Sequence, residues 1–225
     1  MNALLGLSLL CAAVEWYAIA AARRRWEYLA KPGALFFLLL WVLTELPRPM
    51  TTAGSLFAAG LLFSLLGDVL LLLPRRGFLP GLLAFLVAHL AYSAAFNLHR
   101  QPPLLPGALL AAAALGLAAL LIGRLAAALH GRPAARLLPA LAVYGFVLAV
   151  MLWSTVGRLW TAAWPASAAA AVAAGGILFF VSDSLLAWNR FVRPRRLGRL
   201  PVMITYHLAQ VLLSIGVLAA WTRPG

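Results

Sequence analysis

Long apolar runs, separated by short polar interruptions, make up most of the chain. Bounded by arginine, proline or turn residues, they fall at about 2–22, 32–46, 53–73, 78–98, 104–123, 136–156, 166–188 and 200–221. A helix needs roughly 20 apolar residues to cross the roughly 30 Å hydrocarbon core of a bilayer, and all but the short second run come close to that length. Short connections favour antiparallel neighbours. The pattern predicts an all-α, polytopic membrane helix bundle of eight transmembrane helices, forming one transmembrane domain over residues 1–225.

Composition supports a membrane protein and excludes a soluble one. Of the 225 residues, 64% are hydrophobic and 10% are charged, whereas a soluble domain is about 45–50% apolar and about 25% charged. The net charge of +13 does not indicate a nucleic-acid partner, because the arginines lie between apolar runs and not on a soluble domain. They are better explained as topology signals and contacts for membrane lipids. The single cysteine, Cys11, excludes an intramolecular disulfide.

Basic residues gather in alternate connections between the predicted spans, which hold 14 of the 18 lysine and arginine residues. These are Arg23, Arg24, Arg25, Lys31, Arg75, Arg76, Arg124, Arg132, Arg136, Arg190, Arg193, Arg195, Arg196 and Arg199; Arg48, Arg100, Arg158 and Arg223 belong to the opposite side. Short cytoplasmic loops collect basic residues, so both termini are predicted on the non-cytoplasmic side. The basic triplet after the first run favours a retained span over a cleavable signal peptide. The arginine-rich, lysine-poor chain suggests a GC-rich bacterium and its inner membrane.

Two of the five acidic residues, Asp68 and Asp183, lie inside predicted spans. Burying a carboxylate in hydrocarbon costs about 2.5–3.5 kcal/mol even on lenient scales, so each is a candidate functional residue. Asp68 precedes the end of its span by five residues, or roughly 8 Å along a helix, and Asp183 has the same position in its own span. Both are predicted at one depth, in a polar chamber that opens toward the cytoplasmic leaflet.

Further polar residues are predicted near this chamber. Lys31, Glu15 and the Tyr206, His207 and Gln210 cluster belong to the cytoplasmic half, and His89 and Tyr92 lie one turn apart nearer mid-membrane. A simpler structural interpretation pairs Glu15 with Lys31 or an arginine and lets Asp68 accept a bond from Ser64. Tyr144 is predicted to serve mainly in packing, with its hydroxyl in the chamber as the alternative.

Familiar enzyme motifs are absent from the sequence. The histidines do not form an HExxH pattern, and there is no GxSxG elbow or glycine-rich phosphate loop. A zinc hydrolase of the alkaline-ceramidase type needs three histidines and an aspartate, but only His89 and His207 lie within spans. The sequence therefore predicts no metal site.

Several short stretches together resemble the YhhN family of integral membrane lysoplasmalogenases. They run in order over nearly the whole chain: Lys31-Pro32, Ser64–Asp68, Phe78, Gly81–Phe85, His89–Tyr92, Val181–Ala187, Asn189–Phe191 and Thr205–Gln210. His207 departs from the family pattern, which has an aromatic residue after Tyr206. The resemblance implies hydrolysis of the vinyl-ether bond of lysoplasmalogens, with release of a fatty aldehyde and glycerophosphoethanolamine or glycerophosphocholine, and without a cofactor.

This reaction suits two carboxyl groups, because protonation of the alkene carbon gives an oxocarbenium-like cation, as in glycosidases. One of Asp68 and Asp183 would donate the proton while the other stabilises the cation; the sequence does not assign the roles. Supporting roles are predicted for nine further residues. His89, Tyr92, Tyr206, His207 and Gln210 would hold water or the glycerol hydroxyl, Ser64 and Ser182 would orient the aspartates, and Lys31 or Asn189 would meet the phosphate of the lysophospholipid.

Two other classes of function remain open at this point. A proton-coupled or lipid transporter would use the same intramembrane acids, although the chain shows no repeated half. A protein that binds lipid without catalysing a reaction would need only the predicted polar chamber. The sequence does not give an oligomeric state.

Overall fold

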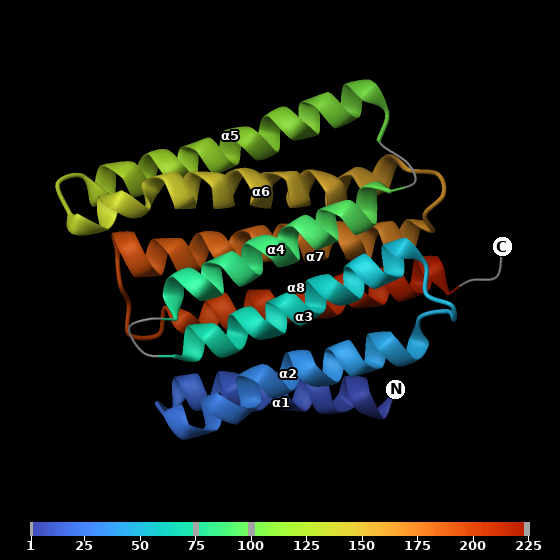
Figure 1. Ribbon diagram of the computed structural model, residues 1–225, viewed down its shortest axis with the longest axis horizontal. Helices are drawn as coiled ribbons and strands as arrows, with labels where there is room; N and C mark the ends of the chain where they lie inside the picture. Colours follow the sequence, from blue (N-terminus) through green and yellow to red (C-terminus); the bar gives the residue numbers. More distant parts are fainter. Residues whose placement is uncertain (1, 74–76, 99–101, 223–225) are drawn as a thin grey trace.

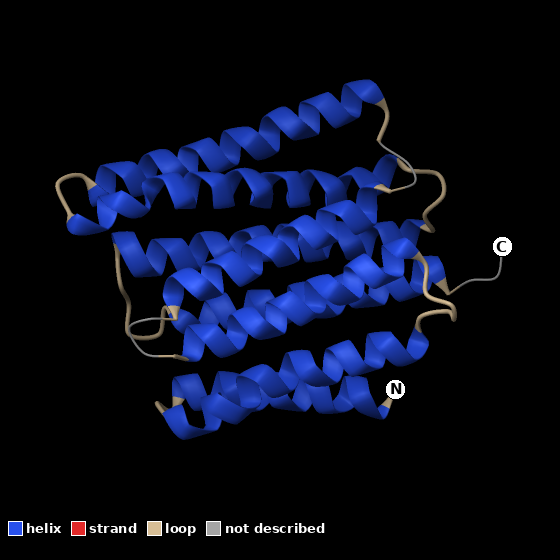
Figure 2. Ribbon diagram, viewed as in Figure 1, coloured by secondary structure: helices blue, strands red, loops and turns tan. Residues whose placement is uncertain are grey.

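The computed structural model describes residues 2–73, 77–98 and 102–222, and within these ranges the regular structure is entirely helical (Figures 1 and 2). The eight α-helices are α1 (Ala3–Ala20), α2 (Arg24–Glu45), α3 (Thr52–Leu72), α4 (Phe78–Asn97), α5 (Leu104–Leu129), α6 (Leu138–Val156), α7 (Ala166–Ala187) and α8 (Arg199–Trp221). All eight are long and apolar enough to cross a membrane. The predicted all-α membrane bundle of eight spans is confirmed.

The largest difference from the predicted spans lies in the second helix. The apolar run begins at 32, but α2 begins at Arg24 and carries Pro32 within it. The additional turns contain Glu27 and Lys31, and both side chains are buried in the bundle. Because these residues are charged, the apolar run in the sequence begins only after them. At the other end of the chain, α7 continues into a π-helical turn, Trp188–Val192, before the connection to α8.

Neighbouring helices pack as antiparallel pairs, and α8 also contacts α1 and α2 (Figure 1). The approach of α7 to α8 requires glycine. A Cβ added at Gly175 would lie 2.8 Å from Leu213 Cγ and 3.0 Å from the Ala209 carbonyl oxygen. Small residues at such positions let membrane helices pack backbone to backbone. This pair therefore fixes the relative positions of the polar residues on α7 and α8.

The two ends of the bundle differ in charge. The connections α1–α2, α5–α6 and α7–α8 lie at one end, at the left in Figure 1, while α1 begins and α8 ends at the other. We call the former the arginine-rich end; its described cations are Arg23, Arg24, Arg25, Arg124, Arg132, Arg136, Arg190, Arg193, Arg195, Arg196 and Arg199. Arg75, Arg76, Arg100 and Arg223 lie outside the described residues. The predicted orientation across the membrane stays a prediction.

Candidate active site

The Asp68 carboxyl forms a buried ion pair on α3, near the arginine-rich end of the bundle. Asp68 is 1% exposed, and Lys31 Nζ on α2 lies 3.2 Å from its Oδ1. The Tyr206 hydroxyl on α8 donates a hydrogen bond to Oδ2 at 2.9 Å. A cation and a hydroxyl donor are the partners of an ionised carboxylate, because a buried charge is stable only when it is paired and hydrogen-bonded. Three helices thus supply the partners that suit an ionised Asp68 carboxylate.

The Asp183 carboxyl has different partners on α4 and α6. The Tyr144 hydroxyl donates to Asp183 Oδ2, and His89 Nε2 lies 3.5 Å from the same oxygen. His89 Nδ1 is bonded to the Phe85 carbonyl oxygen, which only accepts, so Nδ1 carries a proton and Nε2 of a neutral ring carries a lone pair. A neutral His89 ring and a carboxylate thus face each other with two acceptors, and Nε2 has no hydrogen-bond partner among the described residues. A protonated Asp183 carboxyl would supply the missing donor, whereas the Lys31–Asp68 pair already joins a cation to a carboxylate.

Aromatic rings connect the two carboxyl sites. The ring centroid of Phe179 on α7 lies 4.7 Å from that of His89 and 5.5 Å from that of Tyr206. Each of these two neighbours contacts one aspartate. The two carboxyl sites are thus linked through one buried ring.

The Tyr92 hydroxyl forms a third polar group beside Phe179. It donates to Gln210 Oε1 at 2.8 Å and lies 3.5 Å from Ser64 Oγ. The Gln210 amide nitrogen is buried and has no hydrogen-bond partner among the described residues. This nitrogen is an unused donor in the polar interior.

Three contacts expected for the supporting residues are wrong. Ser64 bonds to Tyr92 instead of Asp68, and the Ser182 hydroxyl donates to the Val202 carbonyl at 3.0 Å, so it orients no aspartate. The order of residues along a helix does not show which face of that helix turns toward an aspartate, so the sequence did not reveal the partners of either serine. Lys31 pairs with Asp68 and not with Glu15.

His207 belongs to a separate buried group with α1. Its Nε2 lies 3.3 Å from Glu15 Oε2, and the Trp16 indole N–H donates to its Nδ1 at 3.0 Å. His207 and Glu15 are 3% and 0% exposed. His207 thus contacts α1 and the neighbouring Tyr206 ring, and within the described residues no hydrogen bond or ion pair joins it to either aspartate.

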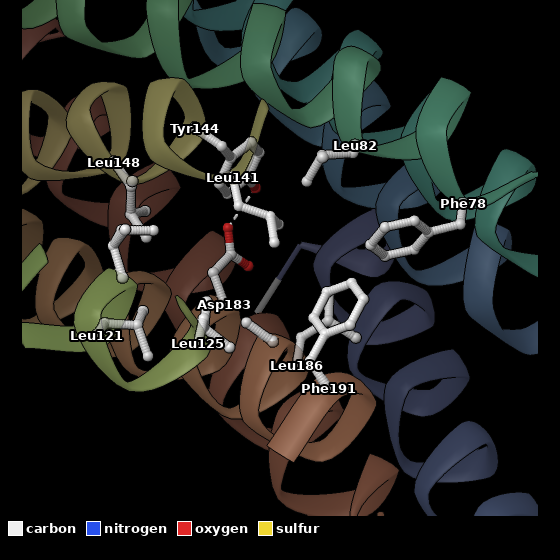
Figure 3. Close-up of a pocket in the computed structure, with 13 residues that line it drawn as sticks. Phe78, Leu82, Leu121, Leu125, Leu141, Tyr144, Leu148, Asp183, Leu186 and Phe191 are labelled. Atoms are coloured by element: carbon white, nitrogen blue, oxygen red, sulfur yellow. Dashed lines mark hydrogen bonds between the residues drawn. The ribbon is translucent and has the colours of Figure 1, made fainter. Parts of the chain in front are cut away.

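An apolar pocket borders Asp183. Leucines from α4, α5, α6 and α7 line it, among them Leu82, Leu121, Leu141 and Leu186. Figure 3 shows the Asp183 carboxyl directed toward Tyr144 among these side chains. A second, polar pocket contains Lys31 and Asn189 in its lining and shares Phe78 and Leu186 with the first.

Two functional candidates were not recognised from the sequence. Tyr144 was expected to pack, but its hydroxyl is a direct partner of Asp183. Glu27 is buried and ion-paired with Arg199 in the polar pocket. The spacing of Glu27 and Lys31, four residues apart on one helix face, was an available signal that the second helix begins before Pro32.

Buried acids at one end of an eight-helix bundle, next to an apolar pocket, define an integral, multi-pass membrane protein with an intramembrane polar site. A model of the YhhN family matches residues 26–217. The chain therefore belongs to the YhhN family.

Curated proteins similar to this chain include several named lysoplasmalogenase. The chain is 42% identical over 159 residues to lysoplasmalogenase TMEM86B of pig (Sus scrofa), covering 70% of this chain and 61% of the relative. It is 34% identical over 180 residues to the human (Homo sapiens) protein of that name, covering 80% and 69%, and 34% identical over 197 residues to the mouse (Mus musculus) protein, covering 87% and 74%. The matched region is thus less than two thirds of the pig relative. No solved structure matches the chain.

Proposed function

We propose that the protein is a membrane-embedded hydrolase that cleaves the vinyl-ether bond of lysoplasmalogens. The products are a fatty aldehyde and glycerophosphoethanolamine or glycerophosphocholine. The family membership and the names of the relatives support this reaction. The observation that carries the mechanism is that the two aspartates have different partners: Asp183 faces His89 and Tyr144 beside an apolar pocket, and Asp68 is paired with Lys31.

These different partners support different chemical roles for the two acids, with Asp183 protonated because its neutral partners supply no opposite charge, and Asp68 ionised beside Lys31. Asp183, as the proton-holding group, donates its proton to the alkene carbon next to the ether-bearing carbon. The electrons of the double bond form the new C–H bond, and the positive charge is shared by the ether-bearing carbon and the ether oxygen. The Asp68 carboxylate contributes a negative potential that stabilises this cation. The apolar pocket beside Asp183 has a cavity volume of about 40 Å³, so it takes only the reacting end of the alkenyl chain.

Water completes the reaction. It attacks the ether-bearing carbon and gives up a proton to the Asp183 carboxylate, which restores the acid. The resulting hemiacetal loses the glycerol oxygen as a hydroxyl and leaves the aldehyde. His89 and Tyr144 hold Asp183 in place, and the unused Gln210 amide and the Tyr92 hydroxyl bind the glycerol hydroxyl or water. The sum is one water consumed per bond cleaved, and no other reactant takes part.

The mechanism predicts where a solvent proton is found in the product. In D₂O, the aldehyde should carry one deuterium on the carbon next to the carbonyl, because that carbon receives the catalytic proton. The purified protein in detergent is given lysoplasmalogen, the aldehyde is trapped at once by borohydride reduction, and the alcohol is examined by mass spectrometry. Product without deuterium would overturn protonation at carbon. Release from an ester-linked lysophospholipid, with none from lysoplasmalogen, would overturn the substrate.

The setting in the membrane is part of the same proposal. The eight helices act as one domain in a bacterial inner membrane, with the arginine-rich end in the cytoplasm and both termini outside. The concentration of arginine in the connections at one end supports this orientation. To test it, Arg132→Cys and Thr51→Cys are made separately in a Cys11→Ser background. A membrane-impermeant maleimide added to intact cells should label Thr51→Cys and leave Arg132→Cys unlabelled. Labelling of Arg132→Cys alone would reverse the orientation.

A further inference from the structure

The polar pocket lies at the arginine-rich end between α2, α7 and α8, and its cavity volume is about 300 Å³. Its charged and amide-bearing lining residues are Arg24, Glu27, Lys31, Asn189, Arg190 and Arg199. Four of these side chains are cations and one is a carboxylate, so the lining has an excess of positive charge. An anion is the ligand that such a lining stabilises.

The cations differ in how far they are already neutralised. Lys31 faces Asp68, and Arg199 is paired with Glu27. Within the described parts of the chain, no carboxylate lies within ion-pair distance of Arg24 or Arg190. Two guanidinium groups therefore remain to bind an anion in this pocket.

Arg190 stands at the boundary between the polar and apolar pockets. Its guanidinium carbon lies 3.7 Å from the centroid of the Phe78 ring, a cation–π contact. Phe78 also lines the apolar pocket, as does Leu186, so the two pockets are contiguous. The π-helical turn Trp188–Val192 carries Arg190, and Asn189 Oδ1 accepts the backbone N–H of Arg195 at 2.9 Å, which holds the connection that follows.

We infer that the polar pocket is the binding site for the phosphate of the lysophospholipid, with Arg190 and Arg24 as its main ligands and Lys31 at its inner edge. This inference rests on the proposed function for the identity of the substrate. Arg24 and Arg190 are exposed at this end of the bundle, and a guanidinium group offers paired N–H donors that match two phosphate oxygens. The pocket thus recognises the anionic end of an amphiphile whose tail begins in the adjoining apolar pocket.

The arrangement of the two pockets fits the covalent order of the substrate. In a lysoplasmalogen the vinyl-ether oxygen and the phosphate are attached to opposite ends of a three-carbon glycerol. Asp183 lies in the apolar pocket and Lys31 in the polar one, with shared walls at Phe78 and Leu186. A phosphate held by Arg190 directs the glycerol, and with it the vinyl-ether bond, toward the region between the two aspartates.

Binding of a lipid that cannot react tests the pocket separately from turnover. The probe is a saturated 1-O-alkyl lysophosphatidylcholine, which keeps the phosphate and the tail but lacks the vinyl ether. A 1-O-alkylglycerol supplies the tail without phosphate, and inorganic phosphate supplies the anion alone. Titrations use the full chain in detergent with the variants Arg190→Gln, Arg24→Gln and, as a control on the same connection outside the pocket lining, Arg196→Gln. Melting temperatures of all variants verify that they are folded.

We expect Arg190→Gln and Arg24→Gln each to weaken binding of the alkyl lysophospholipid by about tenfold or more, as the loss of a charge-assisted contact requires. Binding of the alkylglycerol should change by less than about twofold, and Arg196→Gln should affect neither ligand. Equal weakening of both ligands, or an equal effect of Arg196→Gln, would overturn the phosphate site. Displacement of the probe by millimolar inorganic phosphate would reassign the pocket to free phosphate.

A separate result tests the reaction. If wild type releases no aldehyde from lysoplasmalogen but the alkyl lysophospholipid still binds through Arg190, the vinyl-ether proposal fails and the phosphate site stands. If aldehyde is released and the KM for lysoplasmalogen is unchanged in Arg190→Gln and Arg24→Gln, the phosphate site fails and the reaction stands.

Discussion

Replacing Asp183 with asparagine separates its chemical role from its structural one. The amide has the same shape, but the Tyr144 hydroxyl and His89 Nε2 both face one carboxyl oxygen, Oδ2, so the amide retains only one of the two contacts there. Loss of one buried polar contact costs about 1–3 kcal/mol in the free energy of unfolding, which we expect the folded protein to tolerate. The amide has no acidic proton to give to carbon.

The expected loss of rate follows from that missing proton. A positioned general acid contributes about 10²–10⁴-fold to a rate, which corresponds to about 2.7–5.4 kcal/mol of activation free energy at about 1.36 kcal/mol per factor of ten. We therefore expect kcat for aldehyde release to fall by at least about 100-fold in Asp183→Asn. Binding of the saturated alkyl lysophospholipid should be nearly unchanged, because the carboxyl acts on the reacting carbon and not on the headgroup.

The assay measures aldehyde release by the wild type and the variant in the same detergent, together with their melting temperatures. Ser184→Ala is the matched control, because Ser184 follows Asp183 on α7 but donates only to the Phe180 carbonyl of its own helix. A folded Asp183→Asn protein that keeps more than about a tenth of the wild-type kcat would refute the assignment of Asp183 as the acid.

Three further changes test other parts of the structure. Asp68→Asn should lower the free energy of unfolding by about 3–5 kcal/mol in denaturant titrations, because the Lys31 ammonium loses its counter-charge inside the bundle. Adding Lys31→Met should restore most of that stability. If the double variant is no more stable, loss of the ion pair is not the cause of the destabilisation. Tyr144→Phe should reduce kcat more than it reduces lipid binding, since it removes the donor to the α7 aspartate; equal effects on both quantities would argue against a positioning role. Gly175→Leu should abolish recovery of folded protein in size-exclusion chromatography, because the new side chain meets the α8 backbone. The control Gly116→Ala should behave as wild type, because no atom lies within 4 Å of the added Cβ. Normal recovery of Gly175→Leu would contradict the close α7–α8 contact.

The sequence by itself determined the number of helices and their membrane location. A run of apolar residues long enough to cross a bilayer has one stable backbone structure there, because every N–H and C=O group must be paired within the segment. It also singled out Asp68 and Asp183, since a carboxyl in hydrocarbon is costly wherever it faces. Both properties depend on residue type and position along the chain alone.

Only the tertiary structure decided which polar groups meet. When a helix is apolar on nearly every side, its sequence pattern does not indicate which face turns into the bundle. The spacing of polar residues along the chain therefore did not reveal that Lys31 contacts Asp68 and that Tyr144 contacts Asp183. These contacts depend on the rotation of each helix and on the order of the helices around the bundle. Close packing at positions such as Gly175 fixes both. The aspartates, equivalent in sequence, thereby receive different partners: Lys31 for Asp68, and Tyr144 and His89 for Asp183.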